Sequence, residues 1–198
     1  AKGVVYKMAN IREVSKKYEA QVLEFFKDLH MHPELSFKEF RTTQKIKDLL
    51  ASLGIEIIDM GIETGVVGLL RGKYDGPTVA LRGDIDALPI LEETDVEYKS
   101  TIDGVMHACG HDTHTTALAG AALILSEIRD ELHGNVKFIF QLAEEKNAGA
   151  KMLVEAGVID DVDVIFGLHN HPDVPAGKMG VKLGGLMAAV DTIWIDVY

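Results

Sequence analysis

Thiol, imidazole and carboxylate side chains occur at short spacings in the second half of the sequence. Cys109 and His111 are separated by one residue, Glu144 and Glu145 are adjacent, and His169 follows. Together these side-chain types suit a borderline divalent metal such as Zn²⁺, and they are also compatible with Mn²⁺ or Co²⁺. A lone histidine is more often a surface or hydrogen-bonded core residue, so the coincidence with thiol and carboxylates is what predicts ligation.

The remaining histidines and two aspartates leave alternatives open. We interpret His30, His32 and His133 as surface or hydrogen-bonded core residues. His107, His114 and His171 lie beside the predicted ligands in the sequence. Asp84 and Asp86 follow an apolar run. They could bind metal, orient a ligand from behind, or simply form a turn and cap a helix.

The adjacent glutamates can take two roles. A solvated charge pair is the usual interpretation of Glu-Glu, but here the pair directly follows the apolar run Val136–Leu142. Neighbouring side chains at a strand end point in different directions, so one carboxylate can bind metal while the other holds a water. A carboxylate near two cations stays ionised and can accept a proton from that water.

Apolar periodicity and turn residues predict the elements that position these side chains. The expected helices cover residues 11–29, 37–53, 114–128 and 148–156, and the expected strands cover 55–59, 65–71, 78–81, 136–142 and 162–168, with a turn at 75–77. This alternation predicts a three-layer α/β/α sandwich with a mostly parallel central sheet. Functional side chains gather beyond the carboxyl ends of such strands, where the acidic pairs and His169 fall. Cys109 and His111 are expected in a loop before a helix.

Composition narrows the class of protein. The 198 residues carry a formal net charge of −11 with no Lys/Arg block, which argues against nucleic acid as a partner. We expect no membrane span, because no apolar run approaches the ~18 residues that one needs. The single cysteine excludes an intrachain disulfide and fits a reducing cytoplasm. A cysteine nucleophile at Cys109 is a competing hypothesis, but it leaves the paired carboxylates and the other histidines without a role.

Five segments resemble the aminoacylase-like dinuclear metallopeptidases, a subgroup that includes hippurate hydrolase, N-acyl-amino-acid amidohydrolases, N-acetyl-diaminopimelate deacetylase and auxin-conjugate hydrolases. The segments are Met-His-Pro-Glu-Leu-Ser at 31–36, Leu-Arg-Gly-Asp-Ile-Asp-Ala-Leu-Pro at 81–89, Met-His-Ala-Cys-Gly-His-Asp at 106–112, Gln-Leu-Ala-Glu-Glu at 141–145 and Gly-Leu-His at 167–169. The resemblance runs in order along nearly the whole chain, with Leu142 where relatives commonly have proline.

The resemblance implies a domain that holds two divalent metal ions. It makes Cys109, His111, Glu145 and His169 ligands, Glu144 the general base, and Asp86 a residue that orients the site. It also implies that residues 1–186 are the N-terminal part of the catalytic domain. Residues 187–198 would begin an inserted lid and dimerisation domain, so the chain resembles a C-terminally truncated enzyme whose longer form is compatible with a homodimer.

The function that follows is metal-dependent hydrolysis of the amide bond in a small N-acyl amino acid or short peptide. The second hypothesis is a non-catalytic metal-binding fragment, because the resemblance places a further ligand and the substrate-binding lid beyond residue 198. The third is the cysteine-dependent hydrolase.

Overall fold

The computed structural model describes residues 10–185 together with Ile193, Ile195 and Val197. The domain boundary expected after residue 186 and the start of the lid domain expected over residues 187–198 therefore lie outside the continuous described range.

A mixed sheet of five strands forms the middle layer, in the order β1-β2-β4-β3-β5. The strands are β1 Glu56–Ile58, β2 Val66–Arg71, β3 Tyr74–Asp84, β4 His133–Gln141 and β5 Val164–Gly167. Strand β3 pairs in parallel with both β4 and β5, whereas β2 is antiparallel to β1 and to β4. The predicted α/β class is confirmed, with the parallel pairings in the half of the sheet that carries the chemical side chains.

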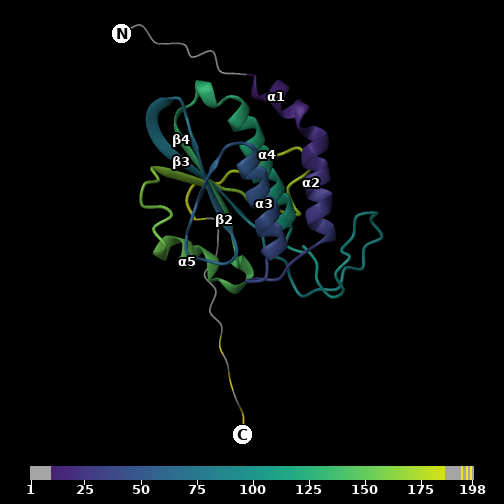
Figure 1. Cartoon of the computed structure of the whole chain (residues 1–198). Helices are drawn as coiled ribbons and strands as arrows, with labels where there is room; N and C mark the ends of the chain where they lie inside the picture. Colours follow the sequence, from purple (N-terminus) through teal and green to yellow (C-terminus); the bar gives the residue numbers. More distant parts are fainter. Residues whose placement is uncertain (1–9, 186–192, 194, 196, 198) are drawn as a thin grey trace.

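Helices cover both faces of this sheet (Figure 1). On one face, α3 (Phe40–Ser52) and α4 (His111–Glu127) bury Ile46, Leu50 and Leu118 against Phe138 and Phe140. On the other face, α5 (Gly149–Glu155) contributes Leu153 to a second core with Val67, Ala80 and Ile139. Two separate cores, one on each face, give the three layers that the alternation of elements predicts.

The helix predicted over 11–29 is two helices, α1 (Ile11–Lys17) and α2 (Glu19–Met31). The break falls at Tyr18, whose φ of −101° and ψ of 0° leave the regular helix. The Tyr18 hydroxyl donates to Glu127 Oε2 at 2.5 Å, and Lys17 Nζ lies 2.9 Å from the same carboxylate. Contacts with the distant end of α4 therefore accompany the break, and no local periodicity could indicate them.

The turn predicted at 75–77 is wrong, because these residues belong to β3. The pairing of β3 with β4 shifts register between Tyr74 and Thr78, which is a local irregularity rather than a reversal. Gly76 and Gly134 allow the two backbones to approach: a Cβ on Gly76 would lie 2.7 Å from the Gly134 nitrogen. Because the irregular part of the strand is exposed, Pro77 is tolerated at this position.

Two predicted helices begin elsewhere than expected. Helix α3 starts at Phe40 rather than at Phe37, whose φ of 66° lies in the left-handed region. Helix α4 starts at His111, directly after Gly110 with φ of 84°, and not at His114. His111 therefore projects from the first turn of a helix, which constrains its direction more than the expected loop would.

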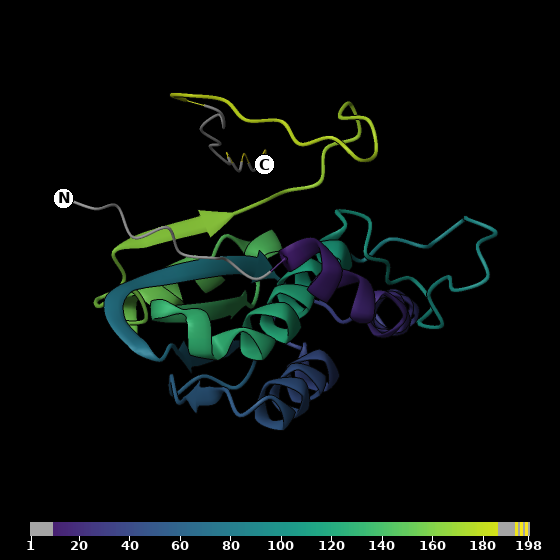
Figure 2. The ribbon, with the colours of Figure 1, turned by 90° about the horizontal axis from the view of Figure 1, so that it is seen from above.

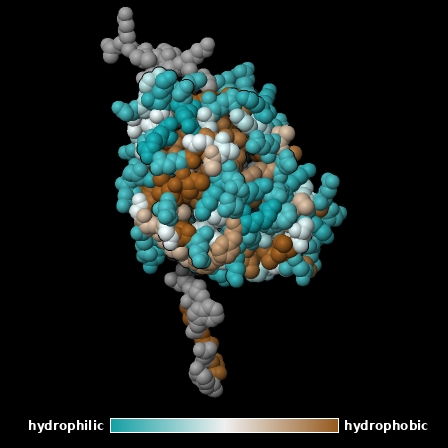
Figure 3. Space-filling view, viewed as in Figure 1, coloured by the Kyte–Doolittle hydropathy of each residue, from teal (hydrophilic) through white to brown (hydrophobic). Residues whose placement is uncertain are grey.

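Strand β5 forms one edge of the sheet, and its burial differs from prediction (Figure 2). Its apolar run predicts a buried strand, yet Val164, Ile165 and Phe166 are 45%, 52% and 60% exposed. In Figure 3 brown apolar side chains gather on the side of the molecule where Figure 1 places β5.

Within the described part of the chain, no helix is both long enough and apolar enough to cross a membrane.

Candidate metal centre

The ends of three adjacent strands and the start of one helix bring the chemical side chains together. Asp84 is the last residue of β3 and lies in register with Gln141, the last residue of β4. Glu144 follows β4 in a single 3₁₀ turn, and His169 follows β5. Because β3, β4 and β5 are parallel, their carboxyl ends meet at one edge, as the sequence predicts.

His111 stands at the centre of this edge. Its ring is fully buried, and Nδ1 lies 3.0 Å from the Asp86 carbonyl oxygen and 3.2 Å from Asp86 Oδ1. Two acceptors at Nδ1 place the proton there, which leaves a lone pair on Nε2. That nitrogen has no hydrogen-bond partner in the described structure, and it lies 3.8 Å from both Glu144 Oε2 and Glu145 Oε1. Burial disfavours the charged ring, but Asp86 and Asp84 raise the pKa of His111 above its usual value.

Asp86 links His111 to the glutamate pair. Its Oδ2 accepts hydrogen bonds from Ser36 Oγ at 2.7 Å and from the Glu145 backbone N–H at 3.0 Å. Burial opposes its ionisation, yet these hydrogen bonds and His111 hold the pKa of Asp86 below its usual value. One fixed carboxylate thus orients the His111 ring and the backbone of Glu145.

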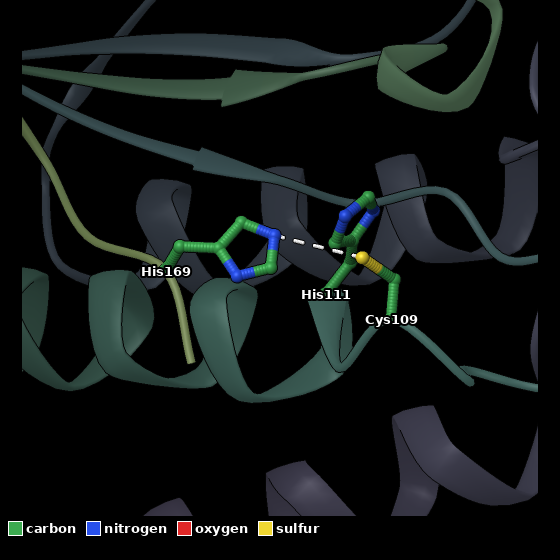
Figure 4. A group of neighbouring side chains, drawn as sticks. All are labelled: Cys109, His111 and His169. Atoms are coloured by element: carbon green, nitrogen blue, oxygen red, sulfur yellow. Dashed lines mark hydrogen bonds between the residues drawn. The ribbon is translucent and has the colours of Figure 1, made fainter. Parts of the chain in front are cut away.

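Cys109 and His169 close the other side of the site (Figure 4). Cys109 Sγ lies 3.5 Å from His169 Nε2, and His169 Nδ1 lies 2.6 Å from the Asn170 carbonyl oxygen. Burial and the charges of Glu145 and Glu144 raise the pKa of the Cys109 thiol to about 12. A cysteine nucleophile needs a lowered pKa, so these surroundings argue against the cysteine-hydrolase hypothesis. A cation at the same point would reverse the effect, since it stabilises the thiolate.

Asp84 and His114 form a buried pair behind the predicted ligands. His114 Nδ1 donates to Asp84 Oδ1 at 2.5 Å, and the Asn170 backbone N–H donates to His114 Nε2 at 2.9 Å. Burial opposes ionisation of Asp84, but His114, His111 and Arg82 lower its pKa to about 2. His114 therefore anchors the loop that carries His169. Sequence reasoning left its role open, although the three-residue spacing from His111 at a helix start was a usable signal.

The side-chain atoms at this edge of the sheet are arranged as ligands for cations rather than as hydrogen-bond partners of one another. Buried polar atoms are nearly always hydrogen-bonded, yet His111 Nε2 and Glu145 Oε1 face each other at 3.8 Å with no hydrogen-bond partner among residues 10–185. The ligand atoms of Cys109, His111 and His169 lie within 4.8 Å of one another, as do those of His111, Glu144 and Glu145. The two groups overlap at His111, whose Nε2 can bind one ion, and Cys109, His169 and the two glutamates supply further donor atoms around it. Asp84, His111 and His114 form a third group by the same criterion.

His171 and His30 lie outside these groups. His171 is exposed, and its ring lies 3.7 Å from Asp173. His30 is a hydrogen-bonded interior residue, as expected, with its ring nitrogens 2.6 Å from Asp112 and 3.2 Å from Glu92. The structure thus brings together all six residues predicted for the site. They are Asp86, Cys109, His111, Glu144, Glu145 and His169.

The chain is an α/β sandwich with thiol, imidazole and carboxylate side chains at its strand ends. This combination of fold and side chains is typical of metallohydrolases. The model of peptidase family M20/M25/M40 matches residues 80–196, which is more than half of the chain. The chain belongs to this family, which confirms the resemblance noted from the motifs.

Several relatives are similar along most of this chain. N-acetylcysteine deacetylase of Bacillus subtilis is 51% identical over 92% of this chain and 48% of its own length. N-acyl-L-amino acid amidohydrolase of Geobacillus stearothermophilus is 43% identical over 94% of this chain and 51% of its own length. The chain therefore spans about half the length of the curated relatives it matches.

Solved structures agree with the fold. The crystal structure of Bacillus subtilis YxeP, described as a dinuclear metal binding peptidase of the M20 family, is 50% identical and superposes with a TM-score of 0.81. The match covers 84% of this chain and 47% of that one. Human carnosine dipeptidase 1, at 20% identity and a TM-score of 0.65, supports the fold alone.

Proposed function

We propose that this chain carries a dinuclear metal centre for hydrolysis of the amide bond in small N-acyl amino acids or short peptides. Cys109, His111, Glu145 and His169 would hold two divalent ions, with Zn²⁺, Mn²⁺ or Co²⁺ compatible. The observation that carries the proposal is the pair of buried, unpartnered atoms on His111 and Glu145, within two groups of ligand atoms. Relatives named for N-acyl and N-acetyl amino acid hydrolysis support the substrate class.

The two ions, when bound, supply Lewis acidity toward the scissile carbonyl and lower the pKa of a water. Glu144 accepts a proton from the attacking water, and the same carboxyl then gives that proton to the leaving amine nitrogen. Its exposure supports this role: the Glu144 side chain is 37% exposed and the Glu145 side chain 20%. Glu145 is also tied through its backbone to Asp86, which suits a fixed ligand better than a mobile base.

Asp86 acts in this mechanism through other groups. Its acceptors keep the proton of His111 on Nδ1, so that the opposite ring nitrogen presents a lone pair toward the glutamates. The net charge of −11 favours a small-molecule substrate over nucleic acid or an anionic membrane surface. A homodimer of a longer protein and a cytoplasmic location are parts of the same proposal.

The test is amine release from a panel of N-acetyl amino acids in the presence of Zn²⁺, Mn²⁺ or Co²⁺. Glu144→Gln should keep the metal content and lower turnover at least ~100-fold, since it removes the general base. Glu155→Gln is the matched control, because Glu155 lies in an exposed ion pair with Lys151. A Glu144→Gln protein that turns over at nearly the wild-type rate would refute the assignment.

A second candidate function is metal binding without turnover. The ligand groups would support metal binding whether or not turnover follows. The same assay separates the two candidates, because this one predicts bound metal and no amine release from the wild-type chain.

A further inference from the structure

We propose that Ser36 and Glu39 are positioning residues, which hold the Glu144–Glu145 turn and the His111 ring in the geometry of the metal centre. The inference rests on the proposed function. It concerns the irregular segment at residues 34–39 between α2 and α3, which has no atom among the three ligand groups.

The 34–39 segment is fixed at several points. The Ala87 N–H, just beyond the end of β3, donates to the Glu34 carbonyl oxygen at 2.8 Å. The Glu34 carboxylate accepts hydrogen bonds from the backbone N–H groups of Arg41 and Thr42 at 3.0 and 2.8 Å, in the first turn of α3. Phe37 has φ of 66°, a conformation that the surrounding contacts must hold. The segment is therefore a rigid support that joins α3 to the site-bearing edge.

Ser36 acts on the site through Asp86. The Ser36 hydroxyl donates to the Asp86 oxygen that also accepts the Glu145 backbone N–H, at 2.7 and 3.0 Å. The other Asp86 oxygen lies 3.2 Å from His111 Nδ1. Without the hydroxyl, the Asp86 carboxylate would lose its shortest hydrogen bond and would be held less tightly against both partners. Ser36 thus helps to fix both the His111 ring and the Glu145 backbone through one carboxylate.

Glu39 acts on the same turn from the other side. Its side chain is fully buried, and Oε1 accepts the Ala143 backbone N–H at 2.8 Å. Ala143 has φ of 45°, an unfavourable conformation for a residue other than glycine, and it directly precedes Glu144. A buried carboxyl group is unfavourable unless a specific hydrogen bond compensates for its desolvation. The compensating bond here holds the turn that projects the glutamate pair.

Amide hydrogen exchange, followed by NMR on the whole ¹⁵N-labelled chain in chelator, tests positioning without metal. Ser36→Ala should speed exchange at the Glu145 amide about tenfold or more, and Glu39→Met should do the same at Ala143. Ser36→Thr and Glu39→Gln retain the hydroxyl and the acceptor oxygen, so they should restore slow exchange. Ser52→Ala is the matched control, since that hydroxyl donates only to Leu49 O in its own helix.

Zn²⁺ affinity of the same variants supplies the second readout. Loss of a side chain that orients a ligand typically weakens metal binding 10- to 100-fold, and we expect this for Ser36→Ala and Glu39→Met. If Glu39→Met fails to fold, Ser36→Ala decides. If the wild-type chain binds no Zn²⁺ while the variants still show faster amide exchange, the metal centre is refuted and the positioning role is supported. Zn²⁺ binding with unchanged exchange and affinity in Ser36→Ala would refute the positioning and leave the metal centre intact.

Discussion

Metal binding at Cys109 should release a proton that no other side chain supplies. The thiol has a pKa of about 12 in the metal-free chain, so it is protonated throughout neutral and mildly alkaline solution. Only the thiolate binds a metal ion, and each bound chain must therefore release that proton. Between about pH 7.5 and 9, loss of the Cys109 proton alone should raise the apparent Zn²⁺ affinity of the wild-type chain about tenfold for every unit that the pH increases.

Cys109→Ser isolates this contribution. The pKa of His111 is also raised, and any proton that His111 releases on metal binding is released by both proteins. The wild-type chain should release about one proton more than Cys109→Ser per chain saturated with Zn²⁺, measured by an indicator in weak buffer. His171→Gln is the control, because His171 lies outside the ligand groups found among the described residues. Equal proton release from wild-type and Cys109→Ser protein would refute Cys109 as a ligand.

Two further predictions concern the scaffold. Asp28 on α2 accepts two hydrogen bonds from Arg41, and its carboxylate lies 2.9 Å from Lys45 Nζ. Burial opposes ionisation of Asp28, but the two cations lower its pKa to about 2. Because the folded pKa is depressed, the stabilisation is present above pH ~4 and is lost as the pH falls through about 2. Asp28→Asn should reduce the free energy of unfolding, measured in urea at pH 7, by about 1 kcal/mol after discounting for solvent screening. The difference between the two proteins should vanish near pH 2. A difference that does not depend on pH would contradict an origin in the Asp28 charge. Gly149→Ala should destabilise the chain by about 3 kcal/mol or more, because the added methyl would lie 1.7 Å from the Leu142 carbonyl oxygen; a melting temperature equal to that of wild type would exclude the clash.

Local pattern accounts for the site more completely than for the fold's details. The placement of Glu144, Glu145 and His169 at strand ends follows from apolar runs and from the general rule for parallel sheets. The long-range contacts did not follow. The break at Tyr18 is accompanied by a bond to Glu127 that lies 109 residues away, and the continuation of β3 through Pro77 involves a partner strand near Gly134.

The supporting residues were the hardest to predict. Glu39 falls within the helix predicted over residues 37–53, and Ser36 is the last residue of the 31–36 motif segment. Only the fold places these side chains against Ala143 and Asp86. The exposure of β5 was mispredicted for a related reason. Its apolar composition indicates burial, whereas its place at the sheet edge is a property of topology that no single segment encodes.

The most direct test of the metal centre is the metal-to-protein ratio of the purified chain, measured by elemental mass spectrometry. The chain is equilibrated with Zn²⁺ or Mn²⁺ and then desalted. The proposed site predicts about two ions per chain, lost when Cys109 and His169 are both replaced by alanine. A ratio near zero for the wild-type chain, or a ratio near two that survives the double replacement, would contradict it.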